Sequence, residues 1–125
     1  MVLKMYKNDG KFITTYNEDA YLLHSIFKYK LVPEGKNEKC GFPKTIEDKI
    51  TSKLEELNIS YEIYYQKELE SLKDYKKKNK YNKYLEEALL QVEIDKKIDL
   101  IKYKLSRLSL EEINKELEKI INTLS

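Results

Sequence analysis

The stretch "GKFITTYNEDAYLL", residues 10–23, combines a β-prone run with the start of a helix. Its Phe-Ile-Thr-Thr-Tyr run is rich in the aromatic and β-branched residues that favour strands. Asn17 is a good N-cap, and Glu18 and Asp19 lie in the first helical turn, where the helix dipole favours negative charge. The stretch therefore predicts a strand that runs directly into a helix. It leaves open whether Phe12 is a core residue or projects outward.

A second β-prone run, "VLKMYK" at residues 2–7, precedes this stretch. The two runs are joined by Asn-Asp-Gly, and Asp-Gly favours a tight hairpin turn because glycine adopts positive φ cheaply. We therefore expect a β-hairpin over residues 2–16. The helix after it should end before Pro33, and residues 32–39 should form a loop. The apolar face of this helix is expected to hold Ala20, Leu23, Phe27 and Leu31.

Residues 40–66 predict a second helix and a further strand. Thr45 is a candidate N-cap, with Asp48 at the third position of a relaxed capping box. Apolar residues recur at helical spacing after it, and Asn58 is a suitable end. Residues 59–66 then alternate with the period of a half-buried strand. The order predicted for residues 1–66 is β-β-α-loop-α-β.

Residues 67–125 contain no glycine or proline and look helical throughout. We expect one helix to begin with Leu69 and Leu72, a break within "KKKNKYNK", and a long helix from about Tyr84. Ser109 and Glu112 form a capping box, which predicts a new helix. The predicted fold is therefore α+β. It has a small mixed β-sheet with two helices in residues 1–66, and a helical appendage of two or three helices, with a helical hairpin, in residues 67–125.

The last two predicted helices carry apolar stripes at alternating spacings of three and four, as in a coiled-coil seam. The stripes match as an antiparallel hairpin. The reverse side of the long helix also needs cover, and a second copy of the chain can supply it by two-fold packing. We therefore expect a homodimer through the C-terminal helices. The stripes are Ile94, Ile98, Ile101, Leu105 and Leu108, then Leu110, Ile113, Leu117, Ile120 and Leu124, and the reverse side holds Leu90, Val92, Leu100 and Tyr103.

Length and composition limit the classes of protein to which this chain can belong. A chain of 125 residues has room for one compact domain, with or without an appendage. No apolar run approaches the roughly 20 residues that a membrane helix needs, and the N-terminus lacks the apolar core of a signal peptide. We therefore expect a cytoplasmic protein without a membrane partner. Cys40 is the only cysteine, so no internal disulfide can form.

Residue types that support catalysis are scarce. His24 is the only histidine, and its place beside an apolar helix face favours a structural role. Gly10, Gly35 and Gly41 are scattered and form no phosphate-binding loop. Carboxylates are dispersed among lysines, as on solvated helix faces. The sequence therefore predicts a protein that is not an enzyme and has no cofactor and no metal site.

The stretch "DYKKKNKYNKY", residues 74–84, is the best local candidate for contact with nucleic acid. Tyrosine rings stack on bases, and lysines neutralise phosphates. The net charge of only +2 and the single arginine, Arg107, give little support for base readout. The alternative is that the lysines keep the chain soluble while the tyrosines bury their rings. The candidate DNA-binding lysines here are Lys76, Lys77, Lys78 and Lys80.

Two longer segments, "GKFITTYNEDAYLLHSIFKYKL" and "KCGFPKTIEDKITSKLEELNISYEIYYQ", carry a resemblance over roughly residues 1–66. They resemble the N-terminal mismatch-recognition domain, domain I, of MutS DNA mismatch-repair proteins. That domain has a Gly-Asp-Phe-Tyr-Glu-like strand, an acidic pair plus alanine that opens a helix, a Gly-Ile/Val-Pro motif, and a strand ending near Glu-Gln. The counterparts here are Gly10 and Phe12, then Glu18, Asp19 and Ala20, then Gly41, Phe42 and Pro43, and finally Tyr61 to Gln66.

The resemblance implies a role for two residues of the first strand. In the family, the phenylalanine wedges beside a mispaired or unpaired base, and a glutamate two residues later hydrogen-bonds it. Phe12 takes the first position, but Thr14 stands at the second, so the carboxylate is missing. We expect weak binding of duplex DNA with a mismatch or distortion, with Lys7, Lys11 and Lys44 around an exposed Phe12. The alternative is a protein–protein interaction module, for which Phe12 would be buried and an apolar patch would lie on the C-terminal helices.

Overall fold

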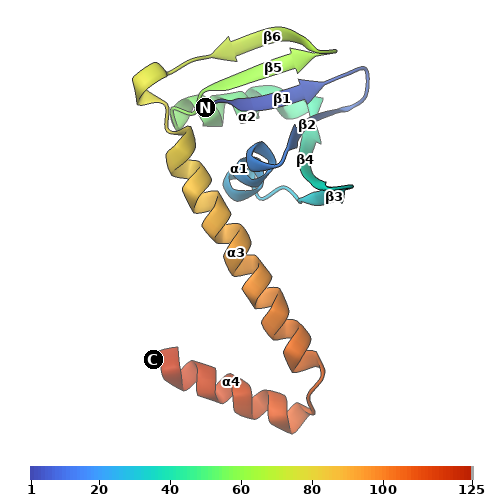
Figure 1. Cartoon of the computed structure of the whole chain (residues 1–125), viewed down its shortest axis with the longest axis vertical. Helices are drawn as coiled ribbons and strands as arrows, with labels where there is room; N and C mark the ends of the chain where they lie inside the picture. Colours follow the sequence, from blue (N-terminus) through green and yellow to red (C-terminus); the bar gives the residue numbers. More distant parts are fainter. Residues whose placement is uncertain (125) are drawn as a thin grey trace. The chain divides into compact units, whose positions relative to one another are not determined.

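The computed structural model describes residues 1–124, which form the α+β fold expected from the sequence. They divide into two compact units, residues 1–91 and the residues from Val92 on. No helix of these residues is long and apolar enough to cross a membrane. The elements are β1 (Leu3–Lys7), β2 (Phe12–Tyr16), α1 (Glu18–Phe27), β3 (Val32–Glu34), β4 (Asn37–Pro43), the 3-10 helix η1 (Lys44–Ile46), α2 (Glu47–Glu56), β5 (Tyr61–Tyr65), β6 (Glu68–Lys73), the 3-10 helix η2 (Lys76–Lys78), α3 (Tyr81–Ser106) and α4 (Leu110–Leu124) (Figure 1).

The strands of the first unit form one mixed sheet in the order β3-β4-β2-β1-β5-β6 (Figure 1). β1 and β5 are parallel, and every other neighbouring pair is antiparallel. The expected hairpin between β1 and β2 is confirmed. The parallel pair is possible because the chain between β1 and β5 is long enough to cross over the sheet.

The hydrophobic core of the first unit lies on one face of this sheet. Alternate strand residues point into it, and α1 and α2 pack on that same face because their buried side chains join one cluster. Each fully buried large aliphatic side chain contributes about 1.5–3 kcal/mol. Thr15 is also buried, and its hydroxyl donates to the Cys40 carbonyl at 2.8 Å. The core includes Leu3, Met5, Ile13, Leu22, Leu23, Phe42, Ile50, Leu54, Ile63, Tyr81 and Leu85.

Two turns differ from the sequence-based expectation. Gly10 does not adopt positive φ in the β1–β2 loop, and its amide donates instead to the Asn8 side chain at 2.7 Å. Residues 32–39, expected to be a loop, contain β3 and the start of β4, which pair as a hairpin. Gly35 turns that hairpin at a φ of 61°, which glycine tolerates better than any other residue.

Both helix caps expected in the first unit are wrong in detail. Asn17 precedes α1, but its side chain makes no capping bond; its amide nitrogen donates to Asn37 Oδ1, and its Oδ1 accepts from the Glu38 amide, both at 3.2 Å. Thr45 lies inside η1, so α2 begins at Glu47 without a side-chain cap. Asn58 follows the end of α2 at a φ of 56°, in agreement with its expected role as a terminator.

The expected helix that begins with Leu69 and Leu72 is wrong, because these residues lie in strand β6. Gln66 and Lys67 adopt φ angles of 48° and 72° and reverse the chain between β5 and β6. A two-residue hairpin turn in which both residues have positive φ is usually recognised in a sequence by Asn-Gly, and that pair is absent here. The expected domain boundary between residues 66 and 67 therefore falls inside a hairpin.

The C-terminal helices form, and the capping box at the start of α4 is confirmed. The Ser109 amide donates to Glu112 Oε1 at 3.2 Å, and the Glu112 amide donates to Ser109 Oγ at 3.3 Å. The expected burial of the two apolar stripes against each other is not observed. Side chains on both remain 40–85% exposed, among them Ile94, Ile98, Ile101, Leu110, Leu117, Ile120 and Leu124.

Candidate nucleic-acid interface

Phe12 projects from the sheet face that lies opposite the core. Ile13 and Thr15 are fully buried, so strand alternation turns Phe12, Thr14 and Tyr16 outward. Within residues 1–91, α1, α2 and the first turns of α3 join the core on the other face of the sheet. Phe12 is 56% exposed. The question left open by the sequence is thus answered in favour of an outward-facing side chain.

An aromatic row crosses the same face beside Phe12. Tyr6 pairs with Thr14 on one side and with Tyr64 on the other. Its ring centroid lies 6.0 Å from that of Tyr16 and 5.5 Å from that of Tyr64. The Tyr64 hydroxyl donates to Glu62 at 2.8 Å. The face therefore presents ring surfaces from three adjacent strands.

A hollow of about 350 Å³ lies beside Phe12. Thr14 and Gly41, which pair across β2 and β4, form its floor. A Cβ atom at Gly41 would lie 3.2 Å from the Ile13 carbonyl oxygen and 3.8 Å from Thr14 Oγ1, so a side chain there would crowd the backbone of β2. The remaining lining residues are Tyr29, Lys30, Val32 and Lys39.

The α1–β3 connection holds Tyr29 at the side of this hollow. The Tyr29 ring stacks on Phe27 with centroids 6.2 Å apart. The Tyr29 carbonyl oxygen lies 2.5 Å from Nδ1 of His24. His24 therefore has a structural contact, as its position in the sequence suggested, and it fixes a residue of the candidate site.

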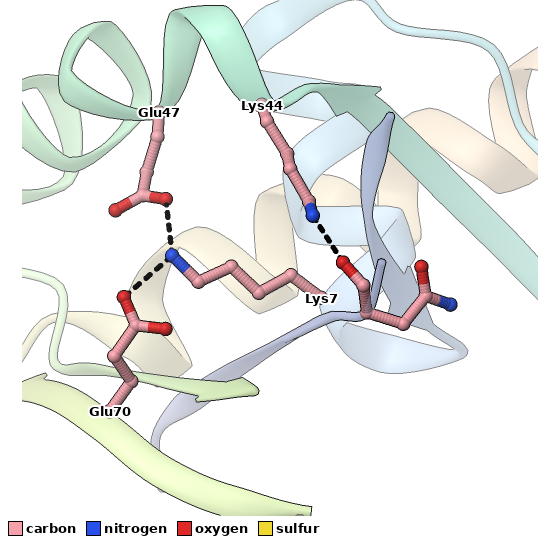
Figure 2. A network of polar contacts seen from close by, with 5 residues as sticks. Lys7, Lys44, Glu47 and Glu70 are labelled. Carbon is pink, nitrogen blue, oxygen red and sulfur yellow. Dashed lines mark hydrogen bonds and ion pairs between the residues drawn. The ribbon is translucent and has the colours of Figure 1, made fainter. Parts of the chain in front are cut away.

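Lys7 does not surround Phe12. Its side chain points to the opposite face, where the ammonium lies 3.0 Å from Glu47 and 2.6 Å from Glu70 (Figure 2). Burial acts to lower its pKa, but the hydrogen bonds with Glu70 and Glu47 prevail and raise the pKa of Lys7 above its usual value. With two carboxylates in contact, this ammonium is poorly suited to neutralise a phosphate.

Lys11 and Lys44 lie together at the Phe12 end of the sheet. The Lys44 amide donates to the Lys11 carbonyl at 2.9 Å. The Lys44 ammonium donates to the Asn8 carbonyl (Figure 2) and lies 5.9 Å from the Tyr65 ring centroid, so it braces the β1–β2 loop. Lys11 is exposed beside Phe12 and is the better candidate for a phosphate contact.

The basic stretch is not brought to Phe12. Lys76, Lys77, Lys78 and Lys80 are exposed, but they follow β6, whose last residue pairs with Tyr61 at the far end of the strands. The separation from Phe12 is roughly 20 Å, from strand rise and spacing. Tyr81 is buried, and its hydroxyl donates to Asp19 at 2.6 Å. The buried-ring alternative therefore holds for this tyrosine.

Groups suited to catalysis are not gathered among residues 1–124. No cluster of three or more His, Cys, Asp or Glu side chains with metal-binding geometry occurs there. Burial raises the pKa of the Cys40 thiol to about 11, which keeps it protonated at neutral pH. Burial also raises the pKa of Asp19, against the lowering effect of the Tyr81 hydrogen bond. The hydrogen bond between Tyr81 and Asp19 thereby joins α1 to α3.

Four residues of this surface were not predicted from the sequence, namely Tyr6, Tyr64, Tyr29 and Gly41. Strand alternation could have placed Tyr6 with Tyr64, whereas Tyr29 and Gly41 needed the tertiary fold. Comparison with known proteins adds no assignment, since neither a protein-family model nor a curated protein matches this chain.

Proposed function

We propose that this protein is a non-enzymatic, cytoplasmic DNA-binding factor that recognises an unpaired or mispaired base through Phe12. The observation that carries the proposal is the 56% exposure of Phe12 on a sheet face opposite the core helices. The resemblance to MutS domain I assigns the same position to a wedge residue. In support, the Gly41-Phe42-Pro43 segment, which also carries that resemblance, pairs directly with β2.

Energetics predict weak binding. Opening a base step costs a few kcal/mol, and one stacked aromatic ring returns about 1–3 kcal/mol. Thr14 offers a hydroxyl where the family has a carboxylate. On the outward face, the strands carry two basic side chains, Lys4 and Lys39, and two acidic ones, Glu34 and Glu62. Phosphate contacts on this face therefore contribute little to the affinity for DNA. The preference for an imperfect duplex depends on contacts with the base.

A second candidate function is a protein–protein interface on the same face. It is favoured by exposed apolar residues on the edge strands, namely Val32, Leu69 and Leu72 at 39–52% exposure. Aromatic side chains among balanced charges are typical of interface cores. A protein–protein interface does not require imperfect and perfect duplexes to bind with different affinities. A comparison of these affinities therefore separates the two functions.

The test is a titration of labelled duplexes of equal length, one perfect, one with a mismatch and one with an unpaired nucleotide, at low salt. We expect the wild type to prefer the two imperfect duplexes by a few-fold, and Phe12→Ala to lose that preference. Leu69→Ala is the matched control, since it removes an exposed apolar side chain from the far strand of the same face. Equal binding of all duplexes by wild type and Phe12→Ala would eliminate the proposal.

A further inference from the structure

We infer that the connection between β6 and α3 is a second DNA contact, separate from Phe12, which binds the phosphate backbone of a duplex whatever its bases are. Residues 73–83, the basic segment, form this connection and run from the end of β6 to the first turn of α3 (Figure 1). The inference rests on the proposed function in taking DNA as the ligand, but it concerns another surface and another part of the ligand.

The basic segment concentrates the positive charge of the chain. Six of its eleven residues are lysines and one is an aspartate, whereas the other 114 residues carry 18 lysine and arginine side chains and 21 carboxylates. The rest of the chain therefore has a net negative charge. An anion is attracted to this connection in particular, because the net charge of +2 arises there.

The lysines at the centre of the segment are not neutralised within the protein. All four are exposed, and none makes an ion pair with a carboxylate of residues 1–124. The ammonium groups of Lys7 and Lys39, by contrast, lie 3.0 Å and 3.6 Å from glutamate oxygens. Four ammonium groups within five residues are thus available to an external anion. They belong to Lys76, Lys77, Lys78 and Lys80.

The segment is held in one conformation before any ligand binds. The Asn79 Oδ1 atom accepts hydrogen bonds from the amides of Ser60 and Tyr81, at 2.9 Å and 3.1 Å. The Tyr75 amide donates to Ser60 Oγ at 2.9 Å. Lysines on a turn that is fixed in this way lose less backbone entropy on binding than lysines on a free loop.

The tyrosines of the segment are not placed to stack on bases. Tyr81 is buried, and the half-buried Tyr75 donates its hydroxyl to the Glu55 carbonyl at 3.4 Å. The Lys73 ammonium lies over the Tyr75 ring, 6.0 Å from its centroid. The segment therefore offers point charges that suit phosphate oxygens and no means of reading a base.

The basic segment and Phe12 contact different parts of a duplex. Their separation of roughly 20 Å, from strand rise and spacing, corresponds to about six base pairs along the duplex axis. We expect the basic segment to set the affinity for DNA and its dependence on salt. Phe12 should set only the preference for an imperfect duplex.

The experiment is a titration of a labelled perfect duplex at several salt concentrations. The variant replaces all four central lysines by glutamine (Lys76→Gln, Lys77→Gln, Lys78→Gln and Lys80→Gln together). Its slope of log affinity against log salt should be shallower than that of the wild type by about 0.9 for each lost phosphate contact, or roughly 3 to 4 in total. Arginine at the same four positions keeps the charge and should keep the slope.

A matched control removes the same charge elsewhere in residues 1–91. It carries glutamine at four other exposed lysines, and its slope should equal that of the wild type. An unchanged slope in the variant of the basic segment, or an equal loss of slope in the control, would overturn the inference. The control lysines are Lys28, Lys36, Lys49 and Lys67.

Competition experiments test the class of ligand. Polyglutamate and vesicles of acidic phospholipid carry negative charge without a duplex. If either displaces the perfect duplex as well as unlabelled duplex does at equal charge, the surface selects charge alone and the inference is overturned. We expect both to compete at least tenfold less well.

A mismatched duplex separates this inference from the proposed function. The glutamine variant of the basic segment should keep the wild-type ratio of mismatched to perfect duplex binding, whereas Phe12→Ala should lose that ratio and keep the salt slope. A ratio of one in the wild type, with a slope that still depends on the four lysines, would remove the proposed function and leave the phosphate contact. A ratio that falls with the lysines and not with Phe12 would overturn the division between the two sites.

Discussion

Thr14 stands two residues after Phe12, where the resemblance to MutS domain I implies a carboxylate. We predict that Thr14→Glu increases the ratio of mismatched to perfect duplex binding, because a carboxylate accepts a stronger hydrogen bond from a base than a hydroxyl does. Thr14→Gln, which has the same shape without charge, separates this effect from size. The measurement is a competition titration with both duplexes. A ratio that Thr14→Glu leaves unchanged would contradict the role of this position.

Cys40 gives a residue-scale test of the core. It is fully buried in β4, and burial raises the pKa of its thiol to about 11 from an ordinary 9.0. Two pH units lower the thiolate fraction roughly a hundredfold, and the thiolate is the reactive species. We predict that a disulfide reagent at pH 8 labels the native protein far more slowly than the denaturant-unfolded protein. Similar rates in both states would show that β4 opens readily.

The sequence did not predict which face of β2 is buried, and therefore did not predict that Phe12 is exposed. Alternation in β2 correctly separated Phe12 and Thr14 from Ile13, but both faces of this strand carry an apolar side chain. The choice depends on the neighbouring strands, where Met5 and Phe42 bury the Ile13 side. That information is tertiary, and periodicity within one strand does not contain it.

Among the elements, α4 has the cap that the sequence predicted. Hydrogen bonds from the backbone and side chain of Ser109 lower the pKa of Glu112 below its ordinary value of 4.5. Since the folded pKa is depressed, this contribution to the helix is complete above about pH 4.5 and is lost as the pH falls through the folded value.

We therefore predict that the far-ultraviolet circular dichroism of the wild type loses helical signal as the pH falls below about 4.5, by more than that of Glu112→Gln. The glutamine keeps the side-chain oxygen of the capping box but has no charge to titrate. Ser109→Ala should reduce the signal at neutral pH as well. Superimposable pH profiles of wild type and Glu112→Gln would rule out the cap as the titrating feature.

The β5–β6 hairpin, like the β3–β4 hairpin, was not predicted from the sequence. Gln66 and Lys67 both adopt positive φ, a conformation that costs roughly 1–2 kcal/mol for a residue with a Cβ. We predict that Lys67→Gly raises the midpoint of thermal unfolding by several degrees, from a net gain of about 1 kcal/mol. Gly35→Ala, at a φ of 61°, should act in the opposite direction. A midpoint that falls with Lys67→Gly would contradict this account.

At the scale of the whole molecule, the two units differ in how they bury apolar surface. Residues 1–91 close a core around one sheet. The strand β4 was missed, whereas α1, α2, β1, β2 and β5 could be predicted from local periodicity. The edge strands β3 and β6 could not, because they are short or exposed and depend on pairing with distant residues. From Val92 to Leu124 no side chain is buried. A single chain therefore leaves these apolar stripes in water.

The apolar residues of α3 after Val92 lie on more than one face. Ile98 and Ile101 are 44% and 48% exposed on the heptad stripe, and Leu100 and Tyr103 are 53% and 60% exposed elsewhere around the helix. One partner helix covers one stripe only, so closure of α4 onto α3 of the same chain would still leave the rest exposed.

We predict that the chain forms a homodimer through these helices. The charges agree, since residues 92–108 carry five basic and three acidic side chains whereas residues 109–124 carry two basic and four acidic ones. The basic segment of one copy can therefore pack against the acidic helix of another by two-fold symmetry. Light scattering across a concentration range should give twice the chain mass of 15.0 kDa. Ile101→Glu should return the monomer mass, whereas Leu72→Glu, an equally exposed site in β6, should leave the dimer intact. A monomer at every concentration would refute the dimer, and a dimer that survives Ile101→Glu would move the interface away from this stripe.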